Sequence, residues 1–332
     1  MLRVWLSLLT LGAASQAIAA GWNPKLAASY LDERQKQWFS WSVAARTGGP
    51  CVSCHTGVSY LIARPALRRV LGESEPTEWE TGLRDALRAR AGSKDAKAIL
   101  KYETEPTATQ AIGVESILAA VFLPDSTAAR ERLWELQKPG GEWNWFVLEL
   151  DPWENNEAPY FGAALAALAT NGAPPDRVAA LRDYLLFNAP TQPLQNRLAL
   201  LWTAKSLPGV AQRKWIDEAF AKQEKDGGWT TASMGPWKTR EKAPPTAPGS
   251  NAYATAFAAF TLGEAGVPPT DPRMVRALNW LRAHQDKTAG YWDAVSMNKP
   301  YPAGPRQEQF MREAATAYAA AALVKAEEGA KR

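Results

Sequence analysis

Two cysteines and a histidine lie close together in the first quarter of the chain. They form the run Cys51-Val52-Ser53-Cys54-His55, and no other cysteine occurs in the 332 residues. C-x-x-C-H is the spacing at which a haem of the c type is attached. The two thiols can form thioethers to the porphyrin, and the histidine that follows can ligate the iron. The pattern therefore predicts one covalent haem c, bound by Cys51, Cys54 and His55, with His55 as the proximal ligand.

Two other uses of this cysteine pair are weaker. A structural zinc site needs four ligands, but His284 is the only other histidine in the chain. A redox-active dithiol is usually found beside a thioredoxin-like strand and helix, and that pattern is missing here. We expect His284 to lie at the end of a helix, where the helix dipole favours its charge. A second iron ligand is its alternative role.

Further haem-binding residues can be proposed from the same segment and from the methionines. Arg64 and Arg68 follow the motif and could pair with the haem propionates, or they could lie on a solvated helix face. Methionine is a common sixth ligand in c-type cytochromes. Met297 is the preferred candidate, and Met234 and Met311 are alternatives. Two alternatives to a methionine ligand are an iron whose sixth position is open and an iron ligated by His284.

The amino-terminal residues have the features of an export signal. Arg3 precedes an apolar run from Val4 to Gly12, and Ala17-Ile18-Ala19 gives the small-residue pattern of a cleavage site. We expect a signal peptide over residues 1–19, cleaved after Ala19 or Ala20, and a periplasmic or secreted protein. No later stretch is long and apolar enough to predict a transmembrane anchor.

The overall charge is close to balanced. The chain has 38 basic and 34 acidic residues, a net charge of +4 and a pI near 9.0. Since the basic residues form no run, a nucleic-acid partner is not indicated.

Helices come in repeated pairs after the first 75 residues, and strand signals are almost absent. In each pair an alanine-rich helix is followed by an amphipathic one, so the first should be buried and the second half-exposed. The fold class predicted is all-α: an α/α toroid over residues 76–332, preceded by a helical haem segment over residues 20–75. An open solenoid uses the same pairs without closing. The clearest pairs are Asn156–Asn171 with Asp176–Asn188, and Asn251–Gly266 with Pro272–Gln285.

A second repeat follows three of the amphipathic helices. Each copy begins with Gln, contains glycine and ends with Trp, and the copies are Gln137–Trp143, Gln223–Trp229 and Gln285–Trp292. Glycine permits the tight turn, the indole can pack over it, and the Gln amide can satisfy groups at helix ends.

These loops on alanine-rich helix pairs resemble the QW repeats of the terpenoid cyclases, squalene–hopene cyclases in particular. The resemblance covers about Thr107 to Glu327 and implies an α/α toroid in which the loops tie the outer helices together. With the haem segment in front, the chain resembles secreted bacterial proteins that place one c-type haem before such a toroid. The D-x-D-D acid motif of the cyclases is missing from the sequence, so cyclase activity is not expected.

Four acidic residues cluster before the helix that starts at Asn156: Glu149, Asp151, Glu154 and Glu157. They could form an acid–base or cation site at the mouth of the toroid. The simpler interpretation is that they complement the dipole of the helix that follows.

Together these features favour an exported monohaem cytochrome that transfers electrons to an unknown redox partner, with the toroid as scaffold and ligand-binding module. One alternative is a haem enzyme with an open iron site, acting on a hydrophobic or glycan ligand in the toroid. Another is a sensor whose haem is a redox switch. The sequence does not predict a competent terpene cyclase.

Overall fold

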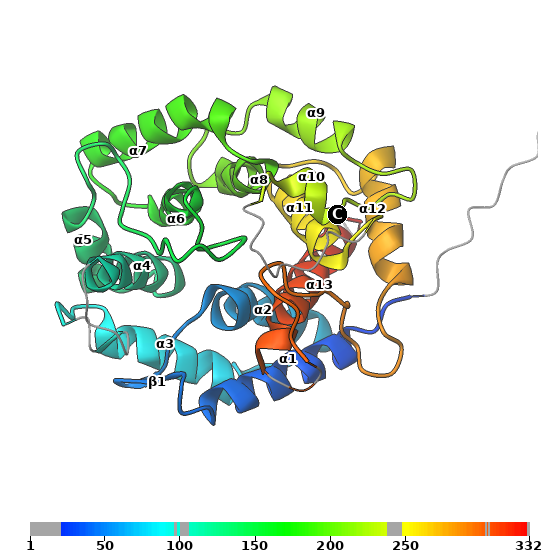
Figure 1. Cartoon of the computed structure of the whole chain (residues 1–332), viewed down its shortest axis with the longest axis horizontal. Coiled ribbons are helices and arrows are strands. Elements are labelled where there is room, and N and C mark those ends of the chain that lie inside the picture. The colour runs from blue at the N-terminus through cyan, green and yellow to red at the C-terminus, as the bar shows by residue number, and fades with distance from the viewer. Residues whose placement is uncertain are drawn as a thin grey trace, which may run out of the picture.

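The computed structural model describes residues 21–95, 98–99, 106–237, 248–302, 304 and 306–330. The predicted signal peptide lies outside these residues. Six helices surround the centre of the molecule and six more surround them in the described part of the chain (Figure 1). The inner helices are α2 (Ser59–Leu71), α4 (Thr107–Phe122), α6 (Ala158–Ala166), α8 (Leu194–Trp202), α11 (Ala252–Glu264) and α13 (Phe310–Ala330). The outer helices are α1 (Pro24–Phe39), α3 (Glu78–Arg90), α5 (Thr127–Glu135), α7 (Pro175–Asn188), α9 (Arg213–Ala221) and α12 (Pro272–Ala283).

The chain alternates between the two layers, which gives the predicted α/α toroid. The inner helices are buried almost all round, and in α11 every residue from Ala252 to Leu262 is buried. Small side chains allow this, because alanine lets neighbouring backbones approach closely. The all-α prediction is confirmed, and the described strands are only a short hairpin of β1 (Ala45–Arg46) and β2 (Gly49–Pro50).

The last inner helix closes the ring. α13 packs against both α11 and α2, so the described helices form a toroid rather than an open solenoid (Figure 1). The first pair, α1 and α2, lies within the segment that the sequence analysis assigned to a separate haem-binding unit. In the structure these two helices take an outer and an inner place in the same ring. α1 itself ends at Phe39.

The three predicted loops tie neighbouring outer helices together through their glutamine side chains. Nε2 of Gln223 donates to the Gly227 carbonyl of its own loop at 2.8 Å and to the Arg273 carbonyl at the start of α12 at 2.9 Å. Gln137 makes the equivalent pair of bonds to its own loop and to Arg177 of α7.

The third loop joins the two ends of the ring. Nε2 of Gln285 donates to the Asn23 carbonyl at 3.0 Å, and its Oε1 accepts from the Asn23 N–H at 2.6 Å. Asn23 is the N-cap of α1, so this loop links the last outer helix to the first. These hydrogen bonds confirm that the loops tie neighbouring outer helices together.

The tryptophans of the loops are buried in equivalent positions. Trp143, Trp229 and Trp292 are at most 1% exposed, and each indole N–H donates at 2.7 Å to a carbonyl near the end of the preceding outer helix. Each indole therefore anchors its loop to the end of the outer helix that precedes the loop.

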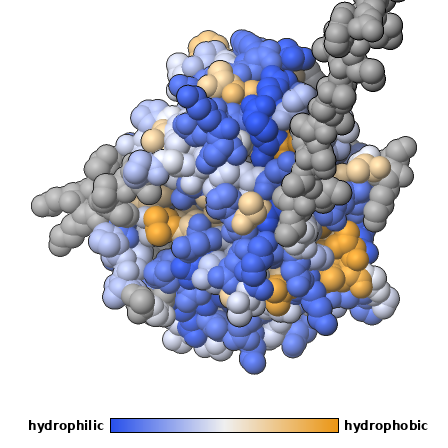
Figure 2. Space-filling model, turned by 90° about the vertical axis from the view of Figure 1, so that its right-hand side faces the viewer, coloured by the Kyte–Doolittle hydropathy of each residue, from blue (hydrophilic) through white to orange (hydrophobic). Residues whose placement is uncertain are grey.

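The remaining short elements connect the helices. They are η1 (Cys54–Val58), η3 (Ala167–Ala169), η4 (Ala189–Thr191), η5 (Thr203–Lys205), α10 (Thr231–Met234) and η6 (Arg306–Gln309). None of the described helices combines the length and apolar character needed to cross a membrane. The face in Figure 2 is mostly hydrophilic, with separate hydrophobic patches.

Candidate active site

The Cys-x-x-Cys-His run forms a tight turn at the start of α2. The hairpin of β1 and β2 leads into it, and the Cys51 N–H donates to the Ala44 carbonyl at 2.8 Å. The Ser53 side chain then caps the turn by accepting from the Thr56 N–H at 3.2 Å. Burial raises the pKa of Cys51 to about 11 and that of Cys54 well above its usual value. Both thiols therefore stay protonated at neutral pH, so neither is activated as a nucleophile.

His55 is held by a buried chain of hydrogen bonds. The Thr56 hydroxyl donates to a carboxylate oxygen of Glu313 in α13, and Arg34 donates to the other oxygen at 2.6 Å. Because the Thr56 proton is committed to Glu313, its oxygen accepts from Nδ1 of His55 at 2.6 Å. Burial lowers the pKa of His55 to about 3. The ring is thus neutral, with its proton on Nδ1 and an accepting lone pair on Nε2.

Aromatic rings pack around this histidine. The Phe310 ring stacks on the imidazole with a centroid separation of 3.6 Å and an angle of 14° between the planes. Trp38 meets the imidazole edge-on, with centroids 5.5 Å apart. The histidine is consequently fixed in one orientation by both packing and hydrogen bonding.

A cavity of about 250 Å³ opens beside His55 where α13 begins. We call it the mouth pocket. Its lining combines aromatic rings, polar groups and two carboxyl groups: His55, Leu150, Asp151, Trp153, Glu154, Ser296, Asn298, Tyr301, Gln307, Phe310 and Met311. Concave sites with an apolar lining and a few convergent polar groups are typical of ligand-binding sites.

Glu154 is the titratable group that stands out in the mouth pocket. Burial raises the pKa of its carboxyl to about 7, and no neighbouring cation in the described residues offsets this effect. The backbone of Glu154 is fixed by a bridge with Leu150, whose carbonyl accepts the Glu154 N–H at 2.8 Å. A carboxyl group that is partly protonated near neutral pH can donate a proton, which an ordinary exposed glutamate cannot do.

Asp151 is the second carboxyl group of the pocket and is held from two sides. Its Oδ1 accepts from Nδ2 of Asn155 at 2.8 Å. Its backbone N–H donates to Oδ1 of Asn298, and Nδ2 of Asn298 donates back to the Asp151 carbonyl, both at 2.8 Å. The loop that carries Asp151 and Glu154 is thereby fastened to the loop before α13.

The raised pKa of Glu154 predicts a pH-dependent stability. The folded-state pKa of about 7 lies above the ordinary value of 4.5. The stabilising contribution of Glu154 to the free energy of unfolding is therefore fully present below pH 4.5 and is lost as the pH rises through 7. Between pH 5 and pH 8 we expect the wild type to lose about 2 kcal/mol of unfolding free energy relative to Glu154→Gln. Urea unfolding at both pH values measures this difference, and exposed Glu157→Gln is the control. A parallel change in wild type and Glu154→Gln would contradict the raised pKa.

The other two predicted acids lie apart from the pocket lining. Glu157 is exposed and stands at the N-cap of α6 without a side-chain capping bond. Glu149 adopts a positive φ of 58° in the same loop. The simple helix-dipole interpretation thus suits Glu157, whereas Asp151 and Glu154 face the pocket.

The two arginines predicted for haem propionates are used inside the fold. Arg64 is 3% exposed and pairs with Asp32 of α1 at 2.9 Å and with Glu73 at 2.6 Å. Arg68 lies 3.6 Å from Glu80 of α3. Buried guanidinium groups need such partners, so both arginines join α2 to neighbouring segments.

The methionines and His284 are spread over the molecule. Met234 is fully buried in α10, Met311 lines the mouth pocket, and Met297 is half-buried against the core without lining that pocket. His284 caps the end of α12 and stacks on Trp280 with centroids 3.7 Å apart. This position confirms the expected place of His284 at a helix end.

No family model matches the chain, and no curated protein matches it. Among solved structures it is similar to an inactive variant, with two aspartates replaced by alanine, of the α-1,6-mannanase GH76A of Salegentibacter sp. HEL1_6 in complex with α-1,6-mannotetrose. The TM-score is 0.50 at 12% identity, over 91% of this chain and 99% of the mannanase chain. At this identity the similarity establishes the α/α-toroid fold.

These findings correct the prediction of haem c, and with it those of a c-type cytochrome, of iron binding and of electron transfer to a redox partner. The matching fold is that of a glycosidase, and no three His, Cys, Asp or Glu side chains among the described residues form a group that could hold a metal ion. In the structure Cys54 is buried in the core, and His55 stacks on Phe310. The predicted roles of His55 and Met297 as iron ligands depended on the haem and are withdrawn with it.

The resemblance to terpenoid cyclases and to monohaem proteins is corrected by the same comparison. The physical reason lies in what the Gln–Gly–Trp loops do. They bond the end of one outer helix to the start of the next. Any ring of helix pairs needs such connections, whatever reaction the protein catalyses. The loops therefore predicted the architecture correctly and the family wrongly.

Several residues of the pocket had no signal in the sequence. Tyr301, Phe310 and Asn298 lie about 150 residues beyond Glu154, and only the closure of the ring brings them there. Glu313 was also missed. Its one visible signal is a charge within the otherwise alanine-rich start of α13, where it is 2% exposed.

Proposed function

We propose that the protein binds a glycan in the mouth pocket and hydrolyses a glycosidic bond there. The observation that carries this proposal is the carboxyl group of Glu154, whose pKa is raised to about 7 inside an aromatic-lined pocket that also contains Asp151. Two carboxyl groups, one of them protonated, are what most glycoside hydrolases use.

Glu154 would act as the general acid. Cleavage of a glycosidic bond requires a proton on the leaving oxygen, and an acid with a pKa near the working pH supplies it best. Burial keeps part of the Glu154 population protonated at neutral pH, as it does for the raised carboxyl groups of other glycosidases.

Asp151 would be the second carboxylate, either as the general base that activates a water molecule or as the nucleophile that attacks the sugar. The bonds from Asn155 and Asn298 fix its position, and a fixed position is needed because the reaction is sensitive to sub-ångström placement.

The remaining lining suits a sugar. Trp153, Tyr301 and Phe310 line the pocket, and the apolar C–H face of a pyranose packs well on an aromatic ring. Nε2 of the neutral His55 can accept from a sugar hydroxyl, because Nδ1 carries the proton. A site with both features can hold a ring-shaped, hydroxyl-rich ligand in one orientation.

The similar mannanase was solved with α-1,6-mannotetrose, so this oligosaccharide is the first to test. Two consecutive aspartates are replaced in the inactive mannanase variant, whereas no two aspartates are consecutive in this chain. The proposed chemistry thus depends on Glu154 and Asp151. Export by the predicted signal peptide to the periplasm or the exterior would bring the protein to extracellular polysaccharides.

The test is an assay of the purified mature chain with α-1,6-mannotetrose and a panel of α- and β-linked oligosaccharides. Binding is measured by calorimetry, and hydrolysis is measured as newly formed reducing ends. Because the acid must be protonated, we expect kcat to fall as the pH rises through about 7. Binding without hydrolysis would reduce the proposal to a glycan-binding protein, and the absence of both would overturn it.

A further inference from the structure

A half-exposed tryptophan stands beside the mouth pocket. Trp41 lies in the loop that follows α1, and part of its ring is open to solvent. Its ring centroid is 6.4 Å from that of Phe310, and Phe310 lines the mouth pocket. A chain molecule that leaves the pocket past Phe310 therefore meets Trp41 next.

The fold fixes the position of the Trp41 ring. Buried Trp38 packs edge-on against both Trp41 and Phe310, with centroid separations of 5.4 Å and 5.9 Å. Nε1 of Trp38 donates to the Cys51 carbonyl at 2.8 Å, and the Ala44 N–H donates to the Trp41 carbonyl at 2.9 Å. The indole is thus a preformed surface, and a ligand that packs on it loses little affinity to ordering the loop.

Arg306 adds hydrogen-bond donors at the same place. Its guanidinium lies over the Trp41 ring, 5.5 Å from the centroid, and the ring stays half-exposed in spite of this contact. Within the described residues Arg306 forms no ion pair or hydrogen bond, and Glu308, two residues on, is paired with Arg312 at 3.1 Å. A sugar has an apolar C–H face and accepting hydroxyl groups, so an aromatic ring beside free N–H donors suits it.

We propose that Trp41 and Arg306 form an outer subsite, which binds a further sugar unit of a glycan whose end occupies the mouth pocket. The substrate class is then a chain of several sugars, because a mono- or disaccharide would leave the outer subsite empty. This inference rests on the proposed function, since the glycan must first bind in the mouth pocket.

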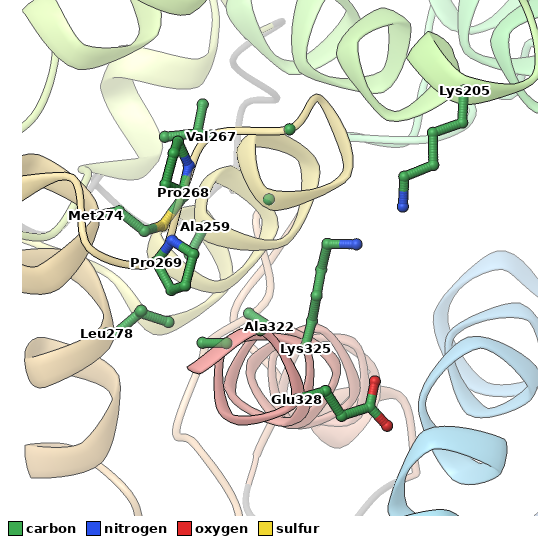
Figure 3. Close-up of a pocket in the computed structure, with 14 residues that line it drawn as sticks. Lys205, Ala259, Val267, Pro268, Pro269, Met274, Leu278, Ala322, Lys325 and Glu328 are labelled. Atoms are coloured by element: carbon green, nitrogen blue, oxygen red, sulfur yellow. The ribbon is translucent and has the colours of Figure 1, made fainter. Parts of the chain in front are cut away.

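A pocket at the other end of the ring lacks this combination. It lies where α11 and α13 end, measures about 360 Å³, and has no aromatic side chain among the described residues that line it (Figure 3). Glu264 already occupies the ammonium groups of Lys205 and Lys325, at 3.3 Å and 2.8 Å. We therefore expect the glycan to extend on the mouth side only, and Met274 of the far pocket can report on the other end.

Calorimetry with α-1,6-mannotetrose and α-1,6-mannobiose tests the outer subsite. The disaccharide should fill the mouth pocket alone, so we expect the wild type to bind the tetrasaccharide at least about tenfold more tightly. Trp41→Ala should bind the two sugars about equally. Arg306→Met keeps the indole and removes the donors, and it should weaken binding of the tetrasaccharide by about threefold or more.

Trp79→Ala is the matched control. Trp79 is also half-exposed and packs edge-on against a phenylalanine, Phe39 of α1, at 5.0 Å between centroids. It does not line the mouth pocket. This variant should keep the wild-type preference for the tetrasaccharide.

Methionine methyl signals test the place of binding. In protein labelled with ¹³C at the methionine methyl groups, the tetrasaccharide should shift the signal of Met311 and leave that of Met274 unchanged. Met274→Leu assigns the second signal.

The outer subsite is overturned if a wild type that binds the tetrasaccharide binds the disaccharide equally tightly, if Trp41→Ala keeps the preference, or if the Met274 signal shifts instead. In each of these cases the proposed glycan binding still stands. A wild type that binds no glycan of the panel overturns the proposed function, and the outer subsite with it.

Discussion

Replacing Glu154 with glutamine should lower the rate of glycan hydrolysis by about 10²- to 10⁴-fold, the usual contribution of a positioned general acid. Glutamine keeps the shape of the side chain but cannot release a proton. Since binding depends on the aromatic lining and on His55, the dissociation constant for the oligosaccharide should stay within about threefold of the wild type. The assay is kcat from reducing ends, together with calorimetric titration of the same samples.

The control for this variant lies in the same loop. Glu157 is exposed and does not line the pocket, so Glu157→Gln should keep wild-type kcat. The falling limb of the pH–rate profile near pH 7 should also disappear in Glu154→Gln. If Glu154→Gln hydrolyses glycans at the wild-type rate, Glu154 is not the acid, whatever the protein binds.

Truncating Trp229 to alanine should destabilise the fold by about 3–5 kcal/mol. The ring is fully buried, its Nε1 donates to the Ala219 carbonyl at 2.7 Å, and its backbone N–H donates to the Thr255 hydroxyl at 3.0 Å. The substitution removes a large apolar side chain and leaves the Ala219 carbonyl without its indole partner. Urea unfolding followed by circular dichroism measures the change in free energy.

Phe187→Ala is the matched control for this truncation. Among the described residues Phe187 is the most exposed large apolar side chain, at 85%, so losing its ring should change stability by no more than about 0.5 kcal/mol. A loss below about 1 kcal/mol for Trp229→Ala would show that the indole does not anchor the loop to the end of α9.

Much of the fold could be predicted from the sequence because its signals are local. The alanine-rich helices, the glycine and proline turns and the Gln–Gly–Trp loops each report on a short stretch of chain. The predicted pair Asn251–Gly266 and Pro272–Gln285 is seen as α11 (Ala252–Glu264) and α12 (Pro272–Ala283). The contact of α13 with α2 joins residues more than 230 positions apart. No local pattern predicts such a contact.

The site was only partly predictable, for the same reason. The acid cluster around Glu154 was visible, but its separation into an exposed Glu157 and a half-buried Glu154 depends on which side chains cover each of them. The Cys51–His55 run shows the opposite case. Its spacing indicated attachment of haem c. In the structure His55 contacts Phe310 and, through Thr56, Glu313, and both of these residues belong to a helix more than 250 residues away.

The bond between Gln285 and Asn23 has a consequence for how the molecule unfolds. In an open array of helix pairs the terminal pairs have one neighbour each and can fray independently. Here the loop after α12 is bonded to the N-cap of α1, and α13 lies between α11 and α2. Every pair therefore has two neighbours, and no pair can leave without breaking two interfaces. A ring of this kind should lose its structure in a single cooperative transition rather than from its ends.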